Sequence, residues 1–165
     1  MKSSPFAFIN DQQVRQKLEL SQSRISSAYE DLFSGYNLAA EDVLNETIRV
    51  DQYNGLIRQH DISFYTFCEH HFLPFFGTAT VTYRPRHIIT GLGKLVRLVR
   101  DVHARRLQIQ ELMARDICED LMRVLDAKGA RVELTARHLC ICSRGPSDDN
   151  AMTTVTYEAG ELYPK

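Results

Sequence analysis

Two short clusters of cysteine and histidine, far apart in the chain, constrain its fold more than any other feature. The first is Cys-Glu-His-His at 68–71, and the second is His-Leu-Cys at 138–140. Thiolate sulfur and imidazole nitrogen are ligands that zinc prefers, and a catalytic zinc site commonly has three protein ligands and one open position. Cys68, His71 and one residue of the second cluster would make up such a set. The sequence therefore predicts that the fold brings the two clusters together.

The second cluster continues a segment in which apolar residues alternate with polar ones, and the histidine and cysteines fall on the apolar positions. These positions hold Val132, Leu134, Ala136, His138, Cys140 and Cys142. Such alternation is typical of one face of a strand, so His138 and Cys140 are expected to share a face. One of them can then bind metal while the other faces substrate. His70 and His138 remain for proton transfer, because histidine titrates near neutral pH.

Two other interpretations of these residues stay open. Cysteine is among the most buried residue types, and a histidine on an apolar strand is often a satisfied core residue. A structural zinc site normally has four protein ligands, and Cys142 could supply the fourth. The occurrence of both clusters in one short chain favours the catalytic interpretation.

Composition excludes several classes of protein. The chain has 165 residues, enough for one domain with a core, and a formal net charge of −1. This charge argues against a nucleic-acid partner bound by bulk electrostatics. No apolar run is long enough to span a bilayer, and the start of the chain lacks the apolar core of a secretion signal. We therefore expect a cytoplasmic protein with no membrane partner, whose cysteines bind metal rather than form disulfides.

Hydrophobic periodicity predicts an α+β fold with an antiparallel four-stranded sheet, two helices on one face of it, and an N-terminal helix. The helices are expected at 12–33, with a break near Ser21, at 92–99 and at 114–125. The strands are expected at 61–67, 76–83, 130–143 and 151–158. We expect a single domain in which 1–35 form a helical segment and 36–165 carry the catalytic residues.

Four motifs, taken in order, give the chain a specific resemblance to one family. They are Phe-Tyr-Thr-Phe-Cys-Glu-His-His-Phe-Leu-Pro-Phe at 64–75, Gly-Leu-Gly-Lys-Leu-Val-Arg at 91–97, Arg-Leu-Gln-Ile-Gln-Glu at 106–111 and His-Leu-Cys at 138–140. In this order and spacing they resemble GTP cyclohydrolase I, over most of the chain. The resemblance implies the tunnelling fold for residues 36–165. It also implies a homo-oligomer, a decamer, in which sheets associate into a barrel and active sites lie at subunit interfaces.

The resemblance also implies a role for each matching residue. Cys68, His71 and Cys140 match the ligands of Zn²⁺, while His70 and His138 match the histidines that move protons. The residues that match or adjoin the substrate-binding positions are Gln110 and Glu111 for the guanine edge, Lys94, Arg97, Arg144 and Arg24 for the triphosphate, and Glu69 beside the metal ligands. A carboxylate suits guanine because it can accept two adjacent N–H donors, and basic side chains suit phosphate.

The reaction implied is hydrolytic opening of the guanine imidazole ring at C8 of GTP, with release of formate and formation of 7,8-dihydroneopterin triphosphate. The chain departs from the family pattern mainly at the phosphate end, at Gly93, Ser147, Asp148, Asp149 and Ala151. These departures leave two alternatives. One is a diverged zinc hydrolase that acts on a less phosphorylated guanine nucleotide or stops at a ring-opened intermediate. The other is a noncatalytic purine-binding module with the same fold.

Overall fold

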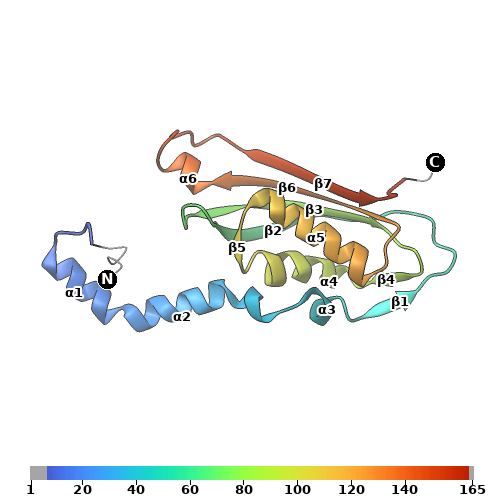
Figure 1. The fold of residues 1–165 in the computed structure, drawn as a ribbon, viewed down its shortest axis with the longest axis horizontal. Coiled ribbons are helices and arrows are strands. Elements are labelled where there is room, and N and C mark those ends of the chain that lie inside the picture. The colour runs from blue at the N-terminus through green and yellow to red at the C-terminus, as the bar shows by residue number, and fades with distance from the viewer. Residues whose placement is uncertain (1–6, 164–165) are drawn as a thin grey trace. The chain divides into compact units, whose positions relative to one another are not determined.

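The computed structural model describes residues 7–163, which divide into two compact units that part after Leu32. The first unit contains helices α1 (Gln12–Leu20) and α2 (Gln22–Leu32) (Figure 1). Asp11 caps α1 by accepting hydrogen bonds from the backbone N–H groups of Gln13 and Val14. The sequence predicts one helix with a break near Ser21, and the structure confirms this, because Ser21 separates α1 from α2.

A five-stranded sheet forms the frame of the second unit, in the order β5-β2-β3-β6-β7. Its long strands are all antiparallel to their neighbours: β2 (Ile57–Cys68), β3 (Pro74–Arg84), β6 (Gly129–His138) and β7 (Thr153–Gly160). The predicted four-stranded antiparallel sheet is therefore confirmed. The structure adds β5 (Leu107–Gln108), which runs parallel to the end of β2, and a separate pair made of β1 (Thr47–Arg49) and β4 (Ile88–Thr90).

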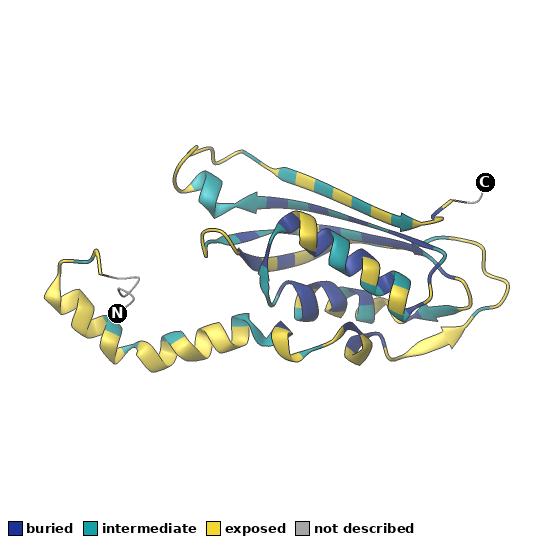
Figure 2. Cartoon of the chain, viewed as in Figure 1, coloured by how far each residue is buried: buried dark blue, intermediate teal, exposed yellow. Residues whose placement is uncertain are grey.

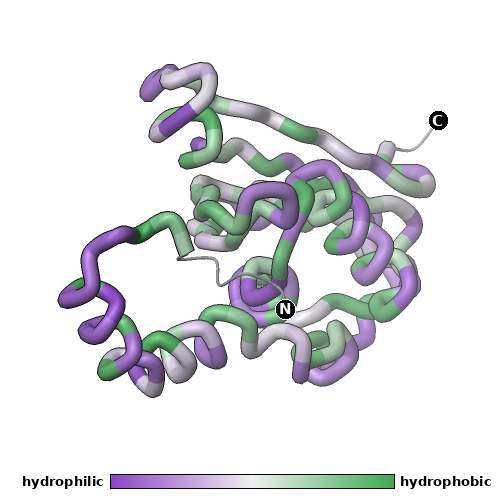
Figure 3. The backbone as a smooth tube through the Cα atoms, turned by 60° about the vertical axis from the view of Figure 1, so that its left-hand side comes forward, coloured by the Kyte–Doolittle hydropathy of each residue, from purple (hydrophilic) through white to green (hydrophobic). Residues whose placement is uncertain are grey.

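Two helices cover one face of this sheet, as the sequence predicts (Figure 1). The first is α4 (Leu92–Arg97), which continues as a π-helix, η2 (Leu98–His103), and the second is α5 (Gln110–Val124). The predicted core positions of α5 are confirmed, since Ala114, Ile117, Cys118 and Leu121 are all fully buried. Figure 2 shows α5 buried on the side that faces the sheet, and in Figure 3 hydrophobic and hydrophilic residues interleave along the elements.

The prediction that a strand continues to residue 143 is wrong. Strand β6 ends at His138, and Leu139–Cys142 form a short helical turn, α6. The last cross-strand pair joins Phe75 to His138, and the residue before Phe75 is Pro74, where β3 begins. Proline has no backbone N–H to donate, so the ladder stops here. Consequently Cys140 lies on a turn beyond the sheet and does not share a strand face with His138.

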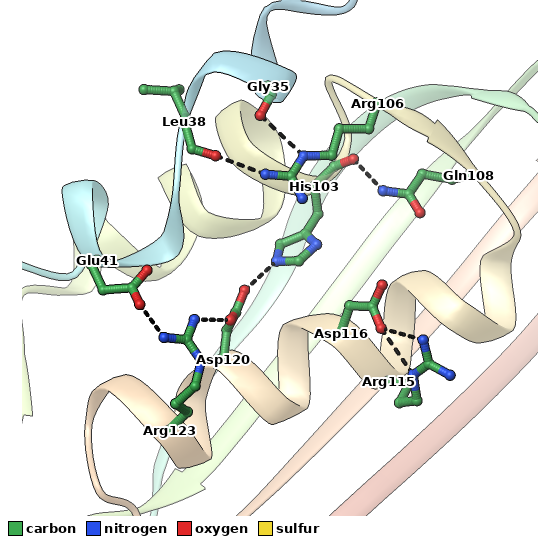
Figure 4. Close-up of polar contacts among 10 residues, drawn as sticks. All are labelled: Gly35, Leu38, Glu41, His103, Arg106, Gln108, Arg115, Asp116, Asp120 and Arg123. Carbon is green, nitrogen blue, oxygen red and sulfur yellow. Dashed lines mark hydrogen bonds and ion pairs between the residues drawn. The ribbon is translucent and has the colours of Figure 1, made fainter.

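The segment that follows the first unit is attached to the helical layer by half-buried and exposed polar contacts (Figure 4). It contains a 3₁₀ turn, η1 (Ser34–Asn37), and a short helix, α3 (Ala40–Val43). Arg106 donates through Nε to the carbonyl of Gly35 at 3.0 Å and through a terminal nitrogen to that of Leu38 at 2.7 Å. Arg123 bridges Glu41 to Asp120, which also pairs with the buried His103 at 3.0 Å.

None of the helices in the described part of the chain is both long enough and apolar enough to cross a bilayer.

Candidate metal centre and active site

The two predicted clusters meet at one end of the sheet. Cys68 is the last residue of β2, His71 lies in the following turn, and Cys140 lies on α6. One ligand atom from each of the three lies within 4.8 Å of the others, and Cys68 Sγ is 4.0 Å from His71 Nδ1. The turn is closed by two backbone hydrogen bonds of 2.8 Å that join Cys68 to Phe72 and to Leu73. These three side chains can therefore hold one metal ion.

The electrostatics of the two sulfurs fit a bound cation. Burial raises the pKa of the Cys140 thiol, the neighbouring Cys68 raises it further, and Arg144 opposes both effects. Two thiolates this close repel each other, so a divalent cation between them would offset the cost of ionising both. One imidazole and two thiolates form a donor set that suits a borderline-soft ion.

Cys142 lies outside this group of ligands. It is the last residue of α6 and is half-buried, but the metal-ligand group among the described residues contains only Cys68, His71 and Cys140. The alternative of a closed structural site with Cys142 as fourth ligand therefore finds no support within residues 7–163. A three-ligand group leaves a coordination position open, as catalytic sites do.

A pocket of about 220 Å³ adjoins the metal-ligand group. Its lining comes from the ends of β2 and β6, the start of α5, the α6 turn and the start of β7: Cys68, His70, His71, Gln108, Ile109, Gln110, Glu111, His138, Cys140, Ile141 and Thr153. The structure thus brings together seven of the residues that the sequence singles out. Glu69, Lys94, Arg97, Arg144 and Arg24 are not part of this lining.

The ring of His138 is held on two sides. It stacks on Phe75, with ring centroids 4.4 Å apart and an interplanar angle of 7°. Its Nε2 is 2.6 Å from Oε1 of Gln110. Burial lowers the pKa of His138, and the carboxylate of Glu111 raises it by a smaller amount. At neutral pH the ring is therefore mainly uncharged and able to accept a proton.

The side chain of Gln110 is buried and makes hydrogen bonds in three directions. Its amide nitrogen donates to the carbonyls of Leu134 at 2.9 Å and of Thr153 at 3.0 Å, while its oxygen faces His138. By contrast, the side chain of Glu111 is exposed and has no hydrogen bond or ion pair with any residue in 7–163. Of this pair, only Glu111 has a side chain available for a ligand.

The basic residues assigned to phosphate do not line this pocket, and only Arg144 is shown close to a residue that does. Lys94 is largely covered at the start of α4, and its Nζ contacts Asn45 at 3.2 Å and Glu46 at 3.0 Å. In Figure 1, α4 begins near β4 and β1, away from the end of the sheet where α6 and β5 lie. Arg97 pairs loosely with Asp101 at 3.9 Å. Burial raises the pKa of the Cys140 thiol, and Arg144 is close enough to Cys140 to offset part of that rise.

Sequence analysis did not identify Phe75, which stacks on the pocket residue His138, or several residues of the pocket lining itself. Phe75 had no signal beyond its place in a motif, because stacking on His138 depends on the register of β3 against β6. Thr153 enters the lining through the pairing of β7 with β6, which no local pattern encodes. Gln108 lies in the motif at 106–111 and alternates there with Gln110, and these two features were the signs available in the sequence.

Comparison with known proteins gives a consistent picture. The model of the family described as GTP cyclohydrolase I matches residues 3–164. The GTP cyclohydrolase 1 of Campylobacter jejuni strain RM1221 is 44% identical over 142 residues, which cover 86% of this chain and 74% of that protein. The GTP cyclohydrolase 1 of Brucella anthropi is 39% identical over 153 residues, which cover 92% of this chain and 71% of that protein. The crystal structure of the apo form of the archaeosine synthase QueF-Like, a tunnelling-fold protein, superposes with a TM-score of 0.52 at 16% identity, covering 68% of this chain and all of that one.

Proposed function

This chain belongs to the GTP cyclohydrolase I family, and from that premise we propose that it is a zinc-dependent hydrolase of GTP. It opens the imidazole ring of guanine at C8, releases formate and forms 7,8-dihydroneopterin triphosphate. The observation that carries this proposal is the meeting of Cys68, His71 and Cys140 beside a pocket that also holds His138 and Glu111. A noncatalytic module would have no chemical use for that combination.

Cys68, His71 and Cys140 would hold the zinc ion, since their two sulfurs and one imidazole nitrogen lie within 4.8 Å of one another, close enough to bind the same ion. When bound, zinc acts as a Lewis acid that lowers the pKa of a coordinated water. The sulfurs must be ionised to act as ligands, and their bonds to the metal would withdraw them from any role as nucleophiles. A cytoplasmic location is part of this proposal, because that compartment keeps Cys68 and Cys140 reduced.

The other residues of the pocket bind the base and move protons. The exposed carboxylate of Glu111 can accept two N–H donors of the guanine edge in a bidentate contact. His70 and His138 lie on the pocket wall beside the metal ligands, where each can give or take a proton at the ring being opened. Because burial favours the uncharged form of His138, this ring is suited to accept a proton first.

A single chain offers only part of the substrate site. The pocket, at about 220 Å³, is smaller than the roughly 300–1,000 Å³ usual for a small-molecule site, so it suits the base better than a whole nucleotide. Lys94 and Arg97 lie outside it, and we propose that their contacts with the triphosphate are made across a subunit boundary. Arg24 is proposed as a further contact with the triphosphate. A homo-oligomer, a decamer, is part of the proposal. No described strand pairs with the outer edge of β7, and such open edges favour pairing with another copy.

A second candidate, a hydrolase of a less phosphorylated guanine nucleotide, is favoured by one feature of the loop after Arg144. Asp148 and Asp149 follow it closely, and the backbone N–H of Asp148 donates to the carbonyl of Ile141, a pocket residue, at 3.3 Å. Two carboxylates near a polyphosphate weaken its binding, although solvent screens exposed charges.

A product assay distinguishes the candidates. Zinc-loaded protein is offered GTP, GDP, GMP and guanosine in parallel, and formate release is followed together with pterin fluorescence and product mass. Formate and a pterin triphosphate from GTP alone establish the proposed function. Formate from a less phosphorylated compound, or without a pterin, favours the second candidate. No formate from any of the four compounds refutes both.

A further inference from the structure

The orientation of the Gln110 side chain is fixed by its surroundings. Gln110 is only 3% exposed, and its amide nitrogen lies within hydrogen-bonding distance of two carbonyl oxygens, those of Leu134 and Thr153. Turning the amide over would place its own oxygen against these two acceptors and leave no donor for either carbonyl. The amide oxygen must therefore face His138.

This orientation determines which nitrogen of His138 carries a proton. An amide oxygen can only accept, and it lies 2.6 Å from Nε2, so Nε2 must be the donor of that hydrogen bond. In the uncharged ring the second nitrogen, Nδ1, is then unprotonated. Among the residues that the structure describes, none makes a hydrogen bond with Nδ1 of His138. The face-to-face contact with Phe75 keeps the ring in this plane.

We propose that Gln110 is a positioning residue that holds His138 as the Nε2–H tautomer, with Nδ1 as the atom that exchanges protons with the substrate. The inference rests on the proposed function, and it gives Gln110 a different role from the guanine contact that the family resemblance implies. Recognition of the guanine edge then falls to the side chain of Glu111, because the Gln110 side chain has no donor left over for a base. A proton taken up at Nδ1 makes the imidazolium, and its return to the substrate from the same atom restores the starting tautomer.

A kinetic comparison separates positioning from substrate binding. Gln110→Met removes the amide with little change in volume, and we expect kcat for GTP to fall ~10- to 100-fold while KM stays within about threefold. Glu111→Gln is the matched variant at the next position, and it should mainly raise KM. If Gln110→Met instead raised KM and left kcat unchanged, Gln110 would be a guanine contact and the proposal would be overturned.

A double variant provides the second test. If Gln110 acts through His138, Gln110→Met combined with His138→Ala should be no slower than His138→Ala alone, because the group to be positioned is already gone. Losses that multiply in the double variant would show that the two residues act independently, contrary to the proposal.

The third test needs neither turnover nor a variant at Gln110. Zinc-loaded protein labelled with ¹⁵N-histidine is examined in long-range ¹H–¹⁵N spectra at alkaline pH, with His138→Gln used to assign the resonance. A protonated Nε2 and a bare Nδ1 in His138 support the proposal, and the opposite tautomer overturns it. Should the parent protein release no formate from GTP, the proposed function would fail while this spectrum still decided the positioning role.

Discussion

The ring of His138 lies on the ring of Phe75, 4.4 Å away and tilted by only 7°, because the two residues are direct partners in the β3–β6 ladder. Phe75 is fully buried. We expect Phe75→Leu to cost about 1–3 kcal/mol of unfolding free energy, through lost packing and stacking, and to lower kcat by loosening His138. Urea unfolding and steady-state kinetics measure the two effects. A variant that loses stability but keeps full kcat would show that the stacking does not orient the ring.

The two cysteines of α6 should differ in their effect on metal content. Cys140→Ser removes a proposed ligand, whereas Cys142→Ser leaves all three in place. Metal analysis of purified protein should find zinc lost or strongly reduced in the first variant and retained in the second. Loss of zinc from Cys142→Ser with retention in Cys140→Ser would reverse the assignment of the ligand.

Mixed oligomers test whether the site is shared between chains. Lys94→Ala and Cys140→Ser should each be inactive with GTP, the first for lack of a phosphate contact and the second for lack of metal. When equal amounts are unfolded and refolded together, random assembly should restore about a quarter of the sites, since each restored site takes its metal ligands from one chain and Lys94 from another. Mixtures no more active than the separate variants would place Lys94 and the metal in the same chain's site, or Lys94 outside it.

Glycine substitutions test the attachment of the segment after Leu32. A Cβ atom at Gly35 would lie 2.3 Å from the carbonyl oxygen of Val102, whereas one at Gly93 meets nothing within 4 Å. Gly35→Ala should therefore destabilise the protein by about 1–3 kcal/mol, while Gly93→Ala in helix α4 should be neutral or stabilising by up to about 1 kcal/mol. Thermal unfolding of the two variants side by side is the measurement. Equal midpoints would contradict the tight packing at Gly35.

Asp120 should contribute to stability in a pH-dependent way. Burial raises the pKa of its carboxyl, but hydrogen bonds with His103 and Arg123 together outweigh burial and bring the pKa below its usual value. A depressed folded-state pKa means that the stabilisation is present above the unfolded-state pKa of about 3.9 and is lost as the pH falls through the lower folded value. Asp120→Asn should lower the unfolding midpoint at pH 7 and flatten its decline below about pH 4. An unchanged decline would assign the acid sensitivity to other carboxyl groups.

Much of the fold followed from local pattern. The break at Ser21, the apolar stripe of α5 and the long strands all come from periodicities that burial on one side imposes, and the structure confirms them. Pairings between distant segments had no such signal. Strand β5 is only two residues long, and β1 and β4 are three each, too short for a period to show.

The candidate metal-ligand group could be predicted because soft donors are chemically distinctive, although only the family resemblance selected Cys140 over His138 as its third member. The three side chains lie together as expected. The surroundings of His138 could not be predicted from the sequence in the same way. The alternating pattern runs on through Cys142, but β6 loses its partner where β3 begins at Pro74, and the chain turns instead. Likewise, the dipeptide Gln-Glu at 110–111 carries no local pattern that predicts a buried side chain for Gln110 and an exposed one for Glu111.

The amide nitrogen of Gln110 also holds the carbonyl of Thr153, the first residue of the edge strand β7. One side-chain amide thus serves two tasks, since it joins the outermost strand to the frame and sets the imidazole beside the metal ligands. A substitution there would alter chemistry and architecture at once, which leaves very few side chains able to replace glutamine at this position.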